Sequence, residues 1–386
     1  MKVTNVARSG GAAGMSRREW LYTAGTGSLL ALTPGRALAA AQTAALAPTA
    51  TATATRDTVL LSMCVSDNMR TLPLRDGRVK PDGINLAVST IHPSEMFWRQ
   101  LRFAEFDISE MSWSSLLIAV SQGDKRWVGL PVFTSRGFPH TGILVRSDRG
   151  IETPADLKGK KIGVPEYQQT SALWSRGILQ HEFGVTPLDI EWYMERTEEL
   201  SHGGATGFQP PAGLKFHRIE PPENIGTMLL DGKIDGSLLY LTDVNLVDRS
   251  RVDLRNRPEI RALFRDPVAE GARYYKKTGF YPANHCVVFK RDVLEKYPWA
   301  ALNVYKAFIA AKDLAHLPGR EIASTYFDLD LLPRAERRVL DVDPFPYGVQ
   351  SNRAMLEALI QYSFEQGLTR RKLTLEEVFY PGTLEL

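Results

Sequence analysis

Two histidines occupy places from which an imidazole can reach a ligand. His140 lies in the loop TSRGFPHTG (134–142), and His285 begins the apolar run HCVVFK (285–290). A histidine gains and loses a proton near neutral pH, so each is a candidate general acid or base. Each also has a structural interpretation. A loop histidine is often solvated, and a strand histidine often bonds a backbone carbonyl in the core.

Two arginines are candidates for holding a carboxylate. Arg70 follows the first apolar run of the chain, and Arg136 shares the 134–142 loop with His140. A guanidinium binds a carboxylate through two parallel hydrogen bonds, which a lysine cannot match. Arg70 has an alternative role, because it could pair with Asp67 or Asp76 in its own loop.

Polar side chains also gather where two predicted strands give way to helices. Ser112 and Ser114 follow the strand expected at 107–110, and such serines either cap the helix or share its free N–H groups with an anion. The turn PEYQQT (165–170) precedes a long predicted helix. It supplies three further candidates for ligand contact: Tyr167, which could stack on an aromatic ring, Gln168, and Thr170, which could instead be the N-cap.

Motifs of several common enzyme classes are missing from the sequence. It contains no GxGxxG after a strand, no P-loop, no HExxH and no Ser-His-Asp arrangement with usable local context. The histidines lack zinc-site spacing, so we expect no structural metal. Cys64 and Cys286 are the two cysteines. They exclude a disulfide scaffold, and we expect both to be free and buried.

Strand and helix patterns alternate along the chain after residue 57. Strands are predicted at 58–65, 127–135 and 161–164, and helices at 92–107 and 170–183. This alternation is typical of α/β proteins with mostly parallel sheets covered on both faces. The length exceeds what one ordinary sheet needs, so we expect two lobes.

The N-terminus resembles an export signal. In MSRREWLYTAGTGSLLALTPGRALAA (15–40), paired arginines precede a mildly apolar stretch and an A-x-A site. We therefore predict a Tat-type signal peptide at 1–40, recognised by the Tat translocase, and a periplasmic location. Met15 is an alternative start. The Ala/Thr-rich segment 41–55 is predicted to be a flexible tether.

Charge argues against a nucleic-acid partner. The formal net charge of the whole chain is +3, but residues 1–40 carry +4, which leaves −1 on the remainder. No apolar run after residue 40 is long enough for a permanent membrane anchor.

Several segments together resemble a known family. TPADLKGKKIGVP followed by DGKIDGSLLY is similar to the second lobe of type 2 periplasmic solute-binding proteins. More specific likenesses to the 4,5-dihydroxyphthalate decarboxylase family, which shares that fold, lie in four stretches: 95–119, 163–185, 285–308 and 343–368. The first loop departs from the family pattern, because Met69 stands where an acidic residue is expected before Arg70-Thr71.

The resemblance implies a two-lobed fold with a ligand cleft between the lobes. The first lobe would comprise 56–145 and 281–386, the latter ending in C-terminal helices, and the second lobe 146–280. Ligands of open α/β sheets bind at the carboxyl ends of strands, where the candidate residues lie.

The resemblance also implies an activity, the non-oxidative decarboxylation of a hydroxylated aromatic carboxylate without a cofactor. His285 and His140 would move protons, and Arg70 and Arg136 would hold carboxylates. The alternative is an exported solute-binding protein that delivers an aromatic or other small organic acid to an ABC-type permease. That function uses the same cleft but needs no proton-transfer residues.

Overall fold

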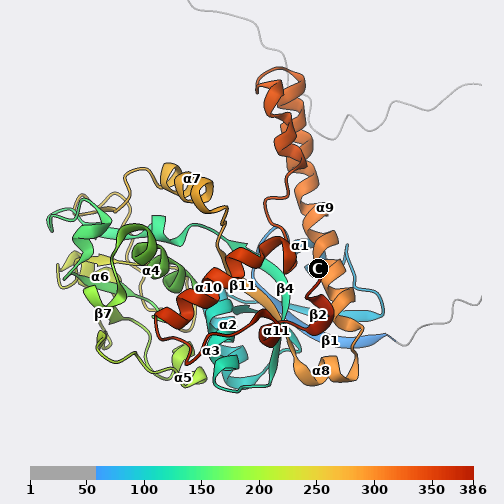
Figure 1. Ribbon diagram of the computed structural model, residues 1–386, viewed down its shortest axis with the longest axis horizontal. Helices are drawn as coiled ribbons and strands as arrows, with labels where there is room; N and C mark the ends of the chain where they lie inside the picture. The colour runs from blue at the N-terminus through green and yellow to red at the C-terminus, as the bar shows by residue number, and fades with distance from the viewer. Residues whose placement is uncertain (1–57) are drawn as a thin grey trace, which may run out of the picture. The chain divides into compact units, whose positions relative to one another are not determined.

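The computed structural model describes residues 58–386, which belong to one compact unit (Figure 1). The predicted signal peptide and tether lie outside these residues. The fold is α/β, and its strands form two sheets, each with parallel and antiparallel pairs. Each sheet is the centre of one lobe. The two-lobed fold expected from the sequence is therefore confirmed.

The first sheet has the strand order β2-β1-β3-β11-β4. Its apolar first strand pairs in parallel with both neighbours, as the alternating pattern predicts. The returning strand β11 is antiparallel to both β3 and β4, so this sheet is mixed. The strands are β1 (Val59–Val65), β2 (Ile84–Thr90), β3 (Ile108–Ser112), β4 (Trp127–Arg136) and β11 (Ala283–Lys290).

The second sheet has the order β10-β5-β9-β6-β7-β8. The pairs among β9, β6, β7 and β8 are parallel, and β5 is antiparallel to β9 and β10. The strands are β5 (Leu144–Arg146), β6 (Lys161–Val164), β7 (Glu191–Met194), β8 (Lys215–Arg218), β9 (Gly236–Ser237) and β10 (Ile260–Ala262). The chain passes between the sheets twice, after β4 and before β11.

Helices connect most of the strands. They are α1 (Leu72–Arg75), α2 (Pro93–Phe103), α3 (Trp113–Ser121), α4 (Thr170–Phe183), α5 (His202–Thr206), α6 (Ile225–Leu230), α7 (Pro267–Thr278), α8 (Arg291–Lys296), α9 (Ala300–Asp328), α10 (Arg353–Glu365) and α11 (Leu375–Val378). Short 3-10 helices include η1 (Pro139–Gly142), η3 (Pro187–Asp189) and η4 (Arg334–Asp341). No helix among residues 58–386 combines the length and the apolar character needed to cross a membrane.

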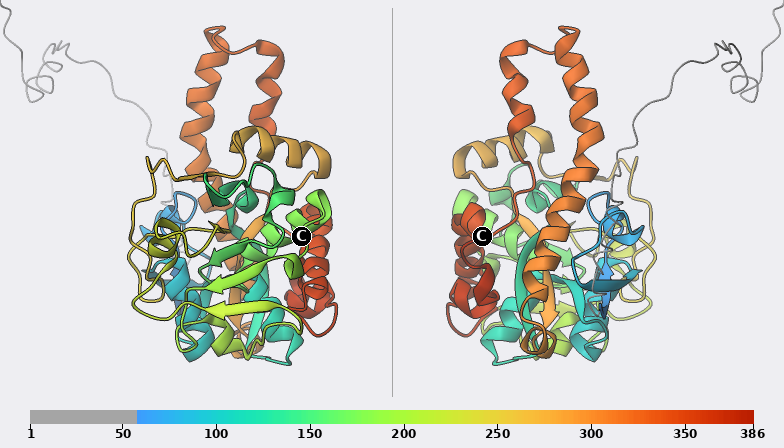
Figure 2. Two further views of the ribbon diagram at one scale, coloured as in Figure 1. Left: turned by 90° about the vertical axis from the view of Figure 1, so that its left-hand side faces the viewer. Right: turned by 90° about the vertical axis from the view of Figure 1, so that its right-hand side faces the viewer.

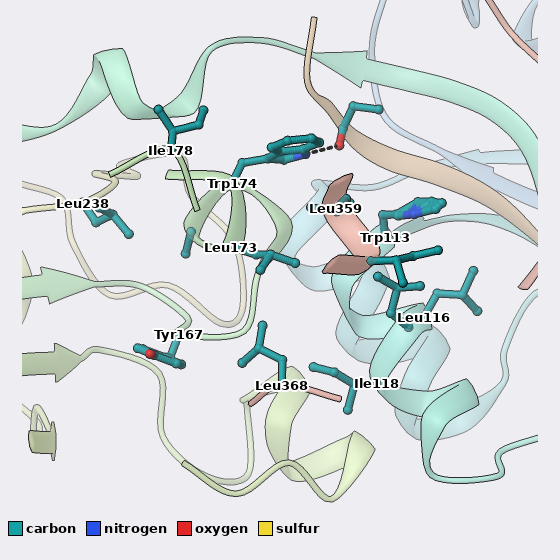
Figure 3. Close-up of a cluster of buried hydrophobic side chains, with 14 of the residues drawn as sticks. Trp113, Leu116, Ile118, Tyr167, Leu173, Trp174, Ile178, Leu238, Leu359 and Leu368 are labelled. Atoms are coloured by element: carbon teal, nitrogen blue, oxygen red, sulfur yellow. Dashed lines mark hydrogen bonds between the residues drawn. The ribbon is translucent and has the colours of Figure 1, made fainter. Parts of the chain in front are cut away.

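A core cluster joins the two lobes where α3, α4 and α10 meet (Figure 3). Trp113 of α3, Trp174 of α4 and Leu359 of α10 are each almost fully buried there. The indole N–H of Trp174 donates a 2.9 Å hydrogen bond to the carbonyl of Ala283, at the start of β11. The start of α4 is thereby held beside the first sheet. Cys64 and Cys286 are free and buried, as predicted.

Helix α9 departs from the layered arrangement. It runs for 29 residues, and its second half stands clear of both sheets together with η4 (Figures 1 and 2). The first half is anchored, because Val304, Tyr305 and Phe308 pack into the core of the first lobe.

Candidate active site

A cavity of about 190 Å³ lies between the two lobes. The first lobe lines it with His92, Pro93, Ser94, Phe97, Ser112, Asn284 and His285. The second lobe lines it with Gln169, Thr170, Ser171, Arg196, His202, Leu239 and Leu241. Three of the lining side chains are therefore imidazoles, those of His92, His202 and His285. The start of α4 forms another part of the wall.

A histidine–glutamate pair forms the chemically most distinctive part of the wall. His285 of β11 lies opposite Ser112 of β3, and Glu110 is two residues away on β3, so both side chains point to the same face of the sheet. The distance from His285 Nδ1 to Glu110 Oε2 is 3.1 Å. Because the carboxylate accepts the Nδ1–H, the Nε2 atom is the one left for a ligand.

Glu110 is held as a carboxylate although it has no exposed surface. Its oxygens accept hydrogen bonds from the backbone N–H of Ser66 at 2.8 Å and from the Ser66 hydroxyl at 2.8 and 3.0 Å. Burial alone would raise the pKa of Glu110, but the hydrogen bonds from His285 and Ser66 outweigh it, and the pKa is lowered. The carboxylate can therefore accept the Nδ1–H of His285 and fix the orientation of its ring.

The second lobe presents a different histidine to the cavity. His202 is 1% exposed, and its Nε2 lies 3.0 Å from the carbonyl oxygen of Ser94. Nε2 also lies 3.2 Å from Nη1 of Arg196. A carbonyl can only accept and a guanidinium can only donate, so a neutral ring satisfies one of these two contacts in either tautomer. The Nδ1 atom is buried and has no partner. Burial, reinforced by the charge of Arg196, lowers the pKa of His202 to about 3, so the ring stays neutral.

Arg196 itself belongs to a buried ion-pair network. Its Nε lies 2.7 Å from Asp248 Oδ1, and its Nη1 lies 3.8 Å from Glu166 Oε2. Asp248 is the closer partner of the guanidinium, and burial raises the pKa of Glu166. The network holds the wall of the second lobe in place beside His202.

Polar contacts also bridge the two lobes at the floor of the cavity. The hydroxyls of Ser112 and Thr170 lie 2.9 Å apart, and the backbone N–H of Ser114 donates to Thr170 Oγ1 at 3.0 Å. The buried Nε2 of Gln169 has no partner. The start of α4 thus offers an unsatisfied amide donor and the positive end of a helix to an anionic group.

The structure brings three of the sequence-predicted residues to this cavity, namely His285, Ser112 and Thr170. Ser114 is adjacent but fully buried, and it contributes its backbone N–H rather than its hydroxyl.

Both predicted arginines are placed elsewhere. Arg70 donates to the carbonyl of Thr134 and stacks over the ring of Phe345. Arg136 donates to the carbonyls of Tyr281 and Pro346 and to the side chain of Asn352. The sheet is irregular at this point, because Ser135 pairs with His285 and Arg136 with Ala283, with a shift of register between them.

His140 does not line the cavity either. It has no exposed surface, and its Nε2 lies 3.0 Å from Glu270 Oε1 within a cage of aromatic rings. Burial lowers its pKa despite the nearby carboxylate. The proposed proton-transfer role therefore has no access to a ligand here, and the structural interpretation describes this residue.

Tyr167 and Gln168 are buried in the second lobe. The guanidinium of Arg176 lies 3.8 Å from the centre of the Tyr167 ring, and Trp192 packs against its edge. Gln168 accepts a hydrogen bond from the hydroxyl of Thr206. Neither lines the cavity. The ligand-facing part of the PEYQQT turn is instead its last two residues together with Ser171.

Sequence reasoning missed Glu110, His202 and Arg196. Glu110 had a readable signal, because it is the one charged residue in the strand ISEMS. A carboxylate in a strand buried at every position must have a partner. His202 and Arg196 come from the segment after β7, which has no motif, and only the tertiary fold shows that they meet the first lobe.

Among residues 58–386, no group of three or more His, Cys, Asp and Glu side chains is arranged to hold a metal ion.

Comparisons with known proteins extend this picture. Residues 132–203 match a family model described as NMT1/THI5 like. Among solved structures, the alkanesulfonate-binding protein SsuA from Xanthomonas axonopodis pv. citri is 15% identical, with a TM-score of 0.48 over 84% of this chain and 99% of that protein. The desulfurization enzyme DSZB is 14% identical, with a TM-score of 0.39 over 85% of this chain and 98% of that protein.

Two curated relatives are more similar in sequence. The 4,5-dihydroxyphthalate decarboxylase of Pseudomonas putida is 33% identical over 226 residues, which are 58% of this chain and 85% of the relative. The enzyme of that name from Comamonas testosteroni is 33% identical over 328 residues, which are 84% of this chain and 97% of the relative. This chain therefore belongs to the 4,5-dihydroxyphthalate decarboxylase family.

Proposed function

We propose that this protein removes one carboxylate from a dihydroxylated aromatic dicarboxylate, 4,5-dihydroxyphthalate, without oxidation and without a cofactor. The observation that carries the proposal is the Glu110–His285 pair, whose imidazole lines the interlobe cavity. Family membership supports the same substrate class.

The size of the cavity suits one substituted ring. A closed cavity of about 150 Å³ holds a benzene molecule, and this one measures about 190 Å³. The ring of Phe97 stands edge-on to His285, with 4.8 Å between centroids, and provides an apolar wall against which an aromatic substrate can pack.

Polar groups on the cavity wall match the carboxylates and phenols of the substrate. A carboxylate would lie at the first turn of α4, near the Gln169 amide and the Thr170 and Ser171 backbone. With the proton of the neutral His202 ring on Nε2, a phenol would donate its hydrogen to Nδ1, which is buried and has no other partner. This acceptor increases electron density on the phenol oxygen.

The reaction then needs one proton at one carbon. Electron density from the phenol para to the departing carboxylate flows into the ring, and His285 Nε2–H protonates the ring carbon that bears this carboxylate. The C–C bond breaks, its electron pair restores aromaticity, and carbon dioxide leaves. His285 regains a proton from solvent while Glu110 stabilises its charged form. The organic product is 3,4-dihydroxybenzoate.

An isotope experiment tests the function. The protein would be incubated with 4,5-dihydroxyphthalate in D₂O, and carbon dioxide and the organic product would be followed by NMR. The proposal expects 3,4-dihydroxybenzoate with one deuterium at carbon 6, where the carboxylate was lost. Phthalate, which lacks the phenols, should yield no carbon dioxide. Tight binding of 4,5-dihydroxyphthalate without release of carbon dioxide would contradict the proposal and favour a solute-binding protein for a permease.

We also propose that the protein is exported to the periplasm by the Tat translocase, on the basis of Arg17 and Arg18. Residues 1–45 fused to a reporter should direct it to the periplasm, and Arg17→Lys with Arg18→Lys should abolish that transport. Unchanged export of the double variant would contradict the Tat assignment.

A further inference from the structure

The second half of α9, the following loop and η4 form a projecting arm, defined here as residues 313–342. The helix continues past the first sheet, turns, and returns through η4, as both views in Figure 2 show. The arm contains Pro318, and it contributes no residue to the interlobe cavity.

The arm carries far more exposed apolar surface than its length explains. Nine large apolar side chains on it are between 37% and 65% exposed. They are Leu314, Leu317, Ile322, Tyr326, Leu329, Leu331, Leu332, Val339 and Val342. Scattered surface leucines are normal, but a concentration of this kind on one element marks an interaction site.

The apolar side chains beyond Pro318 are also ordered. Ile322, Tyr326 and Leu329 are spaced i, i+4, i+7 and lie on one stripe of the helix. Phe327 is 2% exposed within the arm, and α9 contacts η4. The inward side of the helix is thus already covered, and the stripe is a second, uncovered face.

We propose that this arm packs against the same arm of a second copy of the chain. Covering nine side chains of this size would remove on the order of 800 Å² from water on each copy, which is what a standard interface buries per partner.

The charges on the arm favour a like partner over an anionic lipid surface. Residues 313–342 contain four arginines and six carboxylates, a nearly balanced mixture of both signs. A two-fold contact places the same patch on both partners, so basic and acidic side chains can face one another. An anionic membrane would require a net positive arm, and this one has a net charge of −2.

The test is the mass of the purified full chain in solution, by analytical ultracentrifugation at micromolar concentration. We expect twice the 43.1 kDa mass of the chain if the leader is retained, and twice the processed mass otherwise. Ile322→Glu with Leu329→Glu should shift the protein to the monomer, because charges on both sides of the seam repel. Leu188→Glu with Val268→Glu is the matched control, since these residues are 56% and 82% exposed on η3 and α7. The control should remain dimeric.

A wild type that is monomeric at these concentrations would overturn the proposal, as would an arm variant that stays dimeric. Binding of monomeric wild type to phosphatidylglycerol vesicles would overturn it in favour of a membrane. If the glutamate variant does not fold, Ile322→Ser with Leu329→Ser replaces it. That variant should raise the dimer dissociation constant at least about tenfold, and an unchanged constant would contradict the proposal.

Discussion

Two histidine–glutamate pairs of nearly equal length serve different ends in this protein. His285–Glu110 and His140–Glu270 measure 3.1 and 3.0 Å, and each glutamate accepts from one ring nitrogen. His285 lines the cavity, and Nε2 is its nitrogen left for a ligand. Nδ1 of His140, in contrast, is buried and has no partner. A histidine–carboxylate pair therefore becomes a candidate for proton transfer only where the fold leaves its second nitrogen accessible.

The two glutamates also differ in their other hydrogen-bond partners. Glu110 is bonded by Ser66 and His285, so its charge is directed at the histidine. Glu270 also accepts from Arg273 at 2.7 and 2.9 Å, and its charge is neutralised by an arginine. We infer that the first pair stabilises an imidazolium during turnover and that the second holds the crossover segment to α7.

The largest expected difference between the pairs is in catalysis. Glu110→Gln keeps the size of the side chain but removes the charge that orients and stabilises His285. It should lower kcat for carbon dioxide release by about 10²–10⁴-fold. The matched variant Glu270→Gln should stay within about threefold of wild type. Equal losses in both folded variants would show that the two pairs do not differ in function.

A smaller effect is expected on the free energy of unfolding, and it concerns the His140–Glu270 pair. His140→Asn removes a fully buried partner of Glu270 and should lower the free energy of unfolding by about 1–3 kcal/mol, with kcat unchanged within about threefold. Urea unfolding followed by circular dichroism measures the first quantity. An unaltered unfolding midpoint would contradict the structural role.

The same variant should change the pH dependence of stability. Burial lowers the pKa of His140 below its unfolded value near 6.5. The charged groups that act on the ring are Glu270, Arg273 and Glu182. The unfolded state therefore binds the proton first, and stability present above pH 6.5 is lost as the pH falls below it. Wild type should lose stability between pH 7.5 and 5.5, and His140→Asn should lose less over that interval. Identical slopes would rule out this contribution.

The smallest effect concerns the support of Glu110. Ser66→Ala removes one hydroxyl donor but keeps the backbone N–H that donates at 2.8 Å. We expect kcat to fall only a few-fold, measured as initial rates of carbon dioxide release. A loss above a hundredfold would mean that the hydroxyl itself takes part in the reaction.

The regular elements were largely predictable from sequence. Strand 161–164 and helix 170–183 appear with the predicted bounds, because a short apolar run and a long run ending at Gly184 are local signals. The two lobes followed from the alternation of strand and helix, and from the family resemblance.

A site residue was predictable from sequence only where its chemical type and its position near the end of a predicted strand were enough to identify it, as for His285. Arg136 was misplaced because the register of β4 and β11 shifts beside it, and no local pattern predicts such an irregularity. His202 and Glu110 depend on which segments the fold places beside each other. Their contacts, with Ser94 at 108 residues' separation and with His285 at 175, are invisible to a local pattern.

The most direct test of the central claim compares turnover and affinity in His285→Asn. The variant keeps a polar side chain of similar size, so the lobe should remain folded. Calorimetry would give the affinity for 4,5-dihydroxyphthalate, and carbon dioxide release at saturating substrate would give kcat. We predict that kcat falls by about 10²–10⁴-fold while the dissociation constant changes by less than about tenfold. A folded variant that releases carbon dioxide at the wild-type rate would contradict the assignment of His285 as the proton donor.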